Sequence, residues 1–136
     1  MTDCIFCKIA KGEIPTDVIY EDEHAFAFPD AQPNARGHTL VIPKKHFSNI
    51  GEMTPKDFAN LSNAITKISK GILNNSDGMN IFQNNGKIAG QVVNHVHFHL
   101  MPRFNEDGSK FEWKRTKEIS EEENKALIDK IKSFLK

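Results

Sequence analysis

The stretch from His95 to Met101 constrains the fold of this chain more than any other part of the sequence, because it alternates three histidines with bulky apolar residues. Side chains of an extended strand point to opposite faces in turn, so the alternation predicts a strand over about residues 94–102 with its imidazoles on one face and a packing surface on the other. At about 3.3 Å per residue, His95 and His99 are predicted to lie roughly 13 Å apart along the strand. That separation suits contacts along an extended substrate better than three ligands on one metal.

This pattern resembles the His-φ-His-φ-His-φ-φ signature, φ being apolar, of the histidine triad (HIT) superfamily of nucleotide hydrolases and transferases. The resemblance runs from residue 4 to about residue 104 and is closest to the Hint branch, in its zinc-binding Cys-x-x-Cys form. Three further stretches share it: Cys4-Ile5-Phe6-Cys7-Lys8-Ile9, then Glu21-Asp22-Glu23 followed by Ala25-Phe26 and Asp30, then Gly37-His38-Thr39-Leu40-Val41-Ile42-Pro43-Lys44.

Length and charge favour one small domain that handles a small ligand. The 136 residues fit a single domain, 1–136, with a less certain tail over 105–136. Lys plus Arg and Asp plus Glu number 18 each, so the chain has no excess of positive charge of the kind that indicates a nucleic-acid partner. The sequence shows neither a long apolar run nor a basic, hydrophobic leader. We therefore expect no membrane association and a cytoplasmic protein, present also in the nucleus if the source is eukaryotic.

Hydrophobic spacing and turn residues predict an α+β fold. A main helix is expected over about 55–73, where an N-cap, a proline and an acid precede apolar residues at helical spacing. The resemblance implies a five-stranded antiparallel half-barrel sheet with a main helix and short terminal helices, and a homodimer formed through the main helix and the adjoining strand. The predicted smaller elements are helices over 4–11 and after 120, and strands over 16–20, 24–28, 38–42 and 79–83.

Histidine chemistry suits phosphoryl transfer, because a neutral imidazole can attack phosphorus and its pKa near 6.5 leaves it mostly unprotonated at pH 7. The resemblance places the nucleophile at His97, which would form a nucleotidyl-histidine intermediate. It implies that His99 touches the phosphate or the leaving group. It also implies that His95, with His38 behind it, orients the nucleophile.

The nucleotide is expected to be held by three groups of residues. Asp30 is the acid that the resemblance assigns to the ribose hydroxyls; the alternative is an ordinary turn residue that caps its loop. Val92 stands where many Hint-branch proteins have serine or threonine, which leaves the leaving-group preference open. The phosphate donors are expected from Asn84, Gln91 and the main-chain amides of Val92 and Val93, and the base wall from Phe6, Phe28 and Ile42, of which Phe6 equally suits a simple core role.

The only two cysteines, Cys4 and Cys7, have a spacing that indicates metal or redox use in a reducing compartment. Zinc with two cysteines needs two more ligands, and the resemblance supplies them as His46 and His95. Such a zinc would be structural. The alternative is a pair of reduced, buried thiols.

The leading functional hypothesis is an adenosine-type nucleoside phosphoramidase or a related hydrolase acting on a purine nucleotide joined through a P–N or anhydride bond. A dinucleoside polyphosphate hydrolase or nucleotidyl transferase would use the same nucleophile with another leaving group. A nucleotide-binding interaction protein with little turnover is the non-enzyme alternative. A metallohydrolase with the histidines as catalytic ligands is the remaining one.

Overall fold

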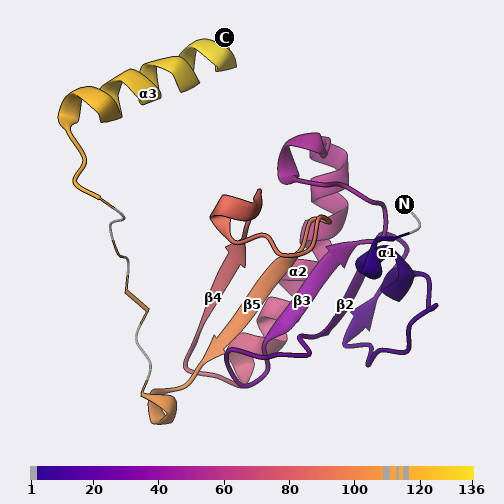
Figure 1. The fold of residues 1–136 in the computed structure, drawn as a ribbon. Coiled ribbons are helices and arrows are strands. Elements are labelled where there is room, and N and C mark those ends of the chain that lie inside the picture. Colours follow the sequence, from indigo (N-terminus) through magenta and orange to yellow (C-terminus); the bar gives the residue numbers. More distant parts are fainter. Residues whose placement is uncertain (1–2, 109–110, 113, 115–116) are drawn as a thin grey trace.

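A five-stranded antiparallel sheet forms the centre of the protein, and one long helix lies across one of its faces (Figure 1). The computed structural model describes residues 3–108, 111–112, 114 and 117–136. The strand order is β1-β2-β3-β5-β4, so β1 and β4 form the two edges. The elements in chain order are α1 (Ile5–Ala10), β1 (Tyr20–Glu21), β2 (Ala25–Pro29), β3 (Thr39–Pro43), η1 (Ile50–Glu52), α2 (Pro55–Asn74), β4 (Gly78–Gln83), η2 (Lys87–Ala89), β5 (Phe98–Arg103), η3 (Asn105–Asp107) and α3 (Glu121–Leu135).

The strands carry a buried apolar surface on each side of the sheet. In β3, Val41 packs in the cluster under α2, whereas Leu40 and Ile42 join the cluster beside α1. This alternation follows from the two-residue period of a strand. The sheet therefore has α2 on one face and α1 with the histidine side chains on the other.

The main helix begins where its capping sequence predicts. Thr54 and Asp57 form a capping box, in which the Thr54 hydroxyl accepts the Asp57 N–H at 3.1 Å and the Asp57 carboxylate accepts the Thr54 N–H at 3.0 Å. Pro55 occupies the first helical position, where a missing N–H has no cost. The helix buries Leu61, Ala64, Ile65 and Ile68 against the sheet.

Two strands differ from their predicted bounds. β1 spans only Tyr20–Glu21 instead of 16–20, and Val18 before it is 54% exposed. β5 begins at Phe98, four residues later than predicted. The amide of Val96 donates to the carbonyl of Phe47 at 2.8 Å, so this part of the chain bonds to a loop instead of a strand.

The C-terminal helix stands away from the sheet (Figure 1). Ser120 caps α3 by accepting the Glu123 N–H at 3.0 Å, as its sequence predicts. None of the residues of α3 is buried. Among the described helices, none combines the length and the apolar character that crossing a membrane requires.

Candidate functional site

His97 presents an unprotonated ring nitrogen at the start of β5. Its Nδ1 lies 2.7 Å from the carbonyl oxygen of His95. A carbonyl can only accept, so Nδ1 carries the proton of the neutral ring and Nε2 keeps its lone pair. Burial lowers the pKa of His97, which is 5% exposed, and so favours the neutral ring. The residue therefore offers a nucleophilic nitrogen at neutral pH.

His99 is oriented by a chain of two hydrogen bonds that ends in a backbone amide. The Asn34 N–H donates to His38 Nδ1 at 3.1 Å, so a neutral His38 carries its proton on Nε2. That nitrogen lies 2.9 Å from His99 Nδ1 and donates to it. His99 therefore presents Nε2–H. His38 lies against His99, whereas the sequence analysis placed it behind His95.

The same surroundings keep His99 neutral. Burial is the main cause that lowers the pKa of His99 to about 4, and the neighbouring His97 and His38 lower it further. Burial also lowers the pKa of His38. The ring centroids of His97 and His99 are 4.9 Å apart, so an unprotonated nitrogen and a hydrogen-bond donor belong to neighbouring rings on the predicted face.

Asp30 lies next to the hydrogen-bonded rings of His38 and His99, with one carboxylate oxygen close to His38. Its Oδ1 accepts the Gln32 N–H at 2.8 Å, which is the loop-capping role considered for it. Its Oδ2 lies 3.5 Å from His38 Nε2, and the side chain is 22% exposed. A cavity of about 240 Å³ beside it is lined by Pro29, Asp30, Pro33 and His38 among others. Asp30 Oδ1 thus has the loop-capping role, and Oδ2 lies next to His38.

Phe6, Phe28 and Ile42 form an apolar wall beside His97. The Phe6 ring packs edge-on against Phe28 at 5.5 Å and against His97 at 5.1 Å. Ile42 is fully buried in the same cluster. Phe6 is therefore both a core residue and a direct neighbour of His97.

The side chain of Gln91 forms hydrogen bonds with two backbone groups of the protein. Its Oε1 accepts the Gly86 N–H at 2.7 Å, and its Nε2 donates to the Ser48 carbonyl at 2.7 Å. Gln91 thus holds the loop before β5 in place through its oxygen and one of the two hydrogens of its amide nitrogen.

The other predicted phosphate contacts flank that loop. The Asn84 side-chain amide lies 3.4 Å from the Gly90 carbonyl. Val93 packs partly buried against the apolar wall, whereas the side chain of Val92 is 90% exposed. The Val92 side chain therefore packs little against the protein, and the expected phosphate contact of Val92 is through its main-chain amide.

Four potential metal ligands converge two residues before His97 in the chain, at His95. These atoms are Cys4 Sγ, Cys7 Sγ, His46 Nδ1 and His95 Nδ1, and all lie within 4.8 Å of one another. His95 Nε2 lies 2.9 Å from the Pro43 carbonyl and must donate to it, so its Nδ1 lone pair faces the two sulfurs and His46. The predicted ligand set is thus brought together from α1, the chain after β3 and the approach to β5.

The spacing of these atoms fits a tetrahedral cation. His95 Nδ1 lies 3.1 Å from His46 Nδ1, 3.3 Å from Cys4 Sγ and 3.5 Å from Cys7 Sγ. Ligands at about 2.0 Å (N) and 2.3 Å (S) from zinc are about 3.3–3.8 Å apart in a tetrahedron. One lone pair accepts a single hydrogen bond, so hydrogen bonding alone does not account for three such close neighbours.

Two backbone groups complete the site, and neither has a side-chain signal in the sequence. The Asn34 amide determines the tautomer of His38, and the Pro43 carbonyl determines that of His95. Every residue type has these groups, so only the folded backbone reveals their roles.

Comparisons with known proteins identify the family of this chain. The family model of the HIT domain matches residues 11–106. An uncharacterized HIT-like protein of Methanocaldococcus jannaschii is 46% identical over 88% of this chain and 94% of its own. An adenosine 5'-monophosphoramidase of Schizosaccharomyces pombe is 42% identical over 98% of both chains. The crystal structure of a HIT family member from Bacillus subtilis matches with a TM-score of 0.83 at 39% identity, over 96% of each chain. The chain therefore belongs to the HIT domain family.

Proposed function

We propose that this protein hydrolyses purine nucleoside phosphoramidates or related AMP conjugates through a nucleotidyl intermediate on His97. The observation that carries the proposal is the free Nε2 of a neutral His97, beside the donor of His99 and the apolar wall. The Schizosaccharomyces pombe relative, which matches over nearly the whole chain, is named for activity on an adenosine phosphoramidate.

In the first step, His97 Nε2 attacks the α-phosphorus while the bond from phosphorus to the leaving amine breaks. The amine needs a proton, and a neutral His99 is a poor acid. A bound anionic phosphate raises the pKa of an adjacent imidazole, so His99 takes up a proton on Nδ1 when the nucleotide binds. His38 Nε2–H can then no longer donate to His99 and turns to Asp30 Oδ2, which lies 3.5 Å away. The protonated His99 gives its Nε2 proton to the leaving nitrogen and keeps the proton on Nδ1.

In the second step, water attacks the phosphorus of the nucleotidyl-histidine and passes a proton to the now neutral His99. The bond from His97 Nε2 to phosphorus breaks, and AMP leaves. The carbonyl of His95 holds His97 Nδ1–H in both steps, so the same nitrogen receives and releases the nucleotide. The two steps together convert the amidate and water into AMP and amine.

We propose that the nucleoside lies between Asp30 and the apolar wall. Asp30 Oδ2 would accept from the ribose hydroxyls, because Oδ1 is already used by Gln32. The base would rest on Phe6, Phe28 and Ile42, next to the ring of His97. Main-chain amides at Val92 and Val93 would approach the phosphate.

We propose that zinc binds to Cys4, Cys7, His46 and His95 and has a structural role. Four protein ligands complete a tetrahedron, so no position remains for a catalytic water. Burial raises the pKa of the Cys7 thiol, and a metal cation at this site would hold it as thiolate. Zinc on the His95 ring would also fix the carbonyl that orients His97.

We propose that the protein forms a homodimer through β4 and α2. β4 has no strand on its outer side among the described residues, and Ile81 there is 47% exposed. Phe58 and Leu73 of α2 are 36% and 53% exposed. Antiparallel pairing of two β4 strands would extend the sheet across both copies.

The test is turnover of adenosine phosphoramidate by His97→Ala, with His24→Ala as a control for an exposed histidine outside the site. We expect His97→Ala to lose turnover and to keep AMP binding within a few-fold by calorimetry. Mass spectrometry of the quenched wild-type reaction should find AMP on the peptide that contains His97. Normal turnover by His97→Ala would refute the proposal.

A further inference from the structure

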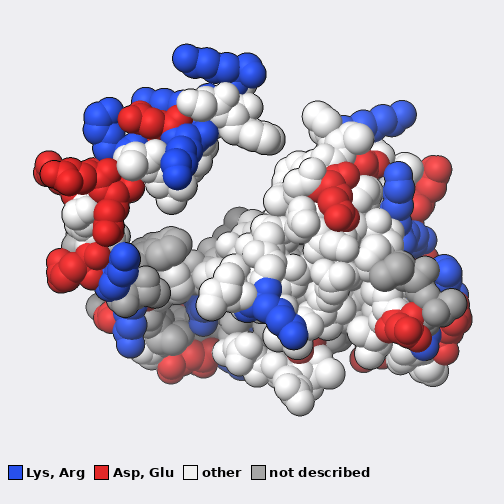
Figure 2. All heavy atoms as spheres, turned by 45° about the horizontal axis from the view of Figure 1, so that its top comes forward, with Lys and Arg blue, Asp and Glu red and all other residues white. Residues whose placement is uncertain are grey.

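The C-terminal helix α3 carries an apolar face that lies in the open. Its apolar positions follow the i, i+4, i+7 spacing of helices that dock in grooves. Figure 2 shows the helix standing clear of the body across an open gap. The exposed fractions are 59% for Leu127, 41% for Ile128, 51% for Ile131, 88% for Phe134 and 75% for Leu135.

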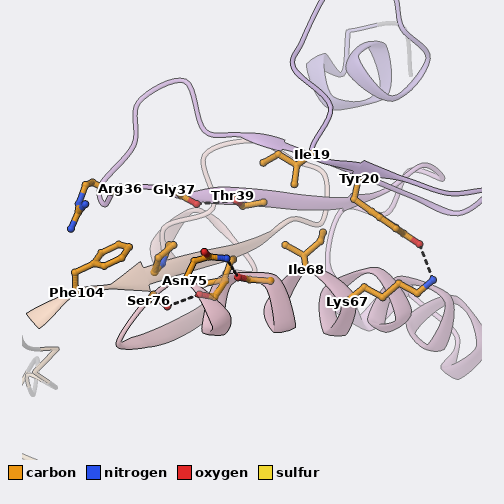
Figure 3. Close-up of a pocket in the computed structure, with 13 residues that line it drawn as sticks. Ile19, Tyr20, Arg36, Gly37, Thr39, Lys67, Ile68, Asn75, Ser76 and Phe104 are labelled. Atoms are coloured by element: carbon orange, nitrogen blue, oxygen red, sulfur yellow. Dashed lines mark hydrogen bonds between the residues drawn. The ribbon is translucent and has the colours of Figure 1, made fainter.

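An apolar groove of about 510 Å³ lies between α2 and the sheet (Figure 3). One end is bounded by Lys67, whose ammonium donates to the Tyr20 hydroxyl at 3.3 Å. The other end is bounded by Arg36, stacked at 4.0 Å on the ring of Phe104. Between them the groove is lined mainly by Ile19, Ile68, Gly71, Ile72 and Pro102.

We propose that the apolar face of α3 in one copy docks in this groove of a second copy. The two surfaces match in chemistry, because each is an apolar strip bordered by charged side chains. Gly71 contributes to the fit, since it leaves open space where a Cβ would stand. Phe134 and Leu135 are the most exposed apolar residues of α3 and would be the anchors.

The path of the chain favours a second copy over the same copy. Arg36 forms ion pairs with Glu106 at 2.7 Å and with Asp107 at 3.1 Å. These pairs hold the start of the C-terminal arm, residues 105–136, beside the groove of the same copy. Phe111 of the arm packs against Phe82 of β4 with 5.5 Å between the ring centroids, and α3 lies beyond that edge of the sheet (Figure 1). The groove extends the opposite way, to Ile19 and Tyr20 by β1. The helix α3 and the groove of the same copy therefore lie towards opposite edges of the sheet.

A second copy paired through β4 brings the two surfaces together. This step rests on the proposed homodimer. A two-fold axis through the β4 pair exchanges the copies, so an arm that extends past β4 of one copy must extend over the body of the other. The match to the Bacillus subtilis structure covers 96% of this chain, which includes most of the arm.

The test is disulfide trapping between two different single variants of the zinc-loaded protein. Asn75→Cys places a thiol at the groove, and Leu135→Cys places one on the apolar face of α3. Mixed and mildly oxidised, the two variants should form a cross-linked pair on a non-reducing gel. Ser133→Cys, on the opposite face of α3, is the matched control and should cross-link about tenfold less.

Filling the groove should prevent the cross-link. A Cβ at Gly71 meets no atom within 4 Å, so Gly71→Phe is accommodated by the fold and occupies the groove. Adding it to the Asn75→Cys chain should reduce the yield about tenfold. A dimer by light scattering without the Asn75–Leu135 cross-link would overturn the docking and leave the β4 interface standing. In a chain that carries both Asn75→Cys and Leu135→Cys, a disulfide within that one chain would overturn docking on a second copy.

Discussion

At the scale of single residues, the orientation of His99 predicts how activity depends on the leaving group. A leaving amine needs a proton, whereas an acidic phenol leaves without one. General acid catalysis contributes about 10²–10⁴ in rate. We expect His99→Gln to lower kcat on adenosine phosphoramidate by about that factor, and by about tenfold or less on an AMP aryl ester of an acidic phenol.

The matched control for this prediction is His38→Leu, which keeps His99 but removes the donor to its Nδ1. We expect the same selectivity for the amine substrate with a smaller loss, because His99 then samples both tautomers. Steady-state kinetics on both substrates checks this. Equal losses on both substrates would show that His99 acts only in binding.

The lowered pKa of His99 also predicts the acid sensitivity of the fold. Its pKa is about 4 in the protein against 6.5 ordinarily, so between those values the unfolded chain binds more protons than the folded one. Stability therefore falls as the pH drops from 6.5 towards 4, by about 1–3 kcal/mol from this residue. The difference in melting temperature between wild type and His99→Gln, measured at pH 7 and pH 4.5, isolates this contribution from loss of metal. Parallel pH dependences of the two proteins would contradict it.

At the scale of elements, α1 is predicted to depend on zinc. A six-residue helix is too short to be stable alone. The proposed metal would join Cys4 and Cys7 of α1 to His46 and His95, and Phe6 between the cysteines packs on the nucleophile. Removing zinc should therefore displace Phe6 and weaken nucleotide binding before it affects the chemical step.

We expect chelation, or Cys7→Ser, to lower the melting temperature by about 10 °C, for a loss of about 3 kcal/mol. KM should rise more than kcat falls. Lys8→Ser, within the same helix but outside the cluster, is the control and should change neither. Purified protein without stoichiometric zinc, or a metal-free protein with unchanged KM, would refute the structural role.

Sequence predicted the elements whose signals are local. The capping box at Thr54 defines the start of α2, and β3 was expected within one residue of its bounds. The starts of β1 and β5 were not predicted, because they depend on pairing partners. Likewise, alternation placed His97 and His99 on one face, but His38 meets His99 through tertiary contacts that no spacing encodes.

At the scale of the whole molecule, the two sheet edges predict the quaternary structure. β1 has two residues and β4 has six, so β4 offers the longer row of backbone groups for another strand. Ile81→Lys places a charge at this edge, where Ile81 is 47% exposed, and should convert a dimer to a monomer by light scattering. Val18→Lys, beside the opposite edge at 54% exposure, should leave the dimer intact. Since the proposed nucleophile His97, His99 and the apolar wall all come from one copy, the Ile81→Lys monomer should retain turnover. A dimer that survives Ile81→Lys but not Val18→Lys would place the interface at β1 instead.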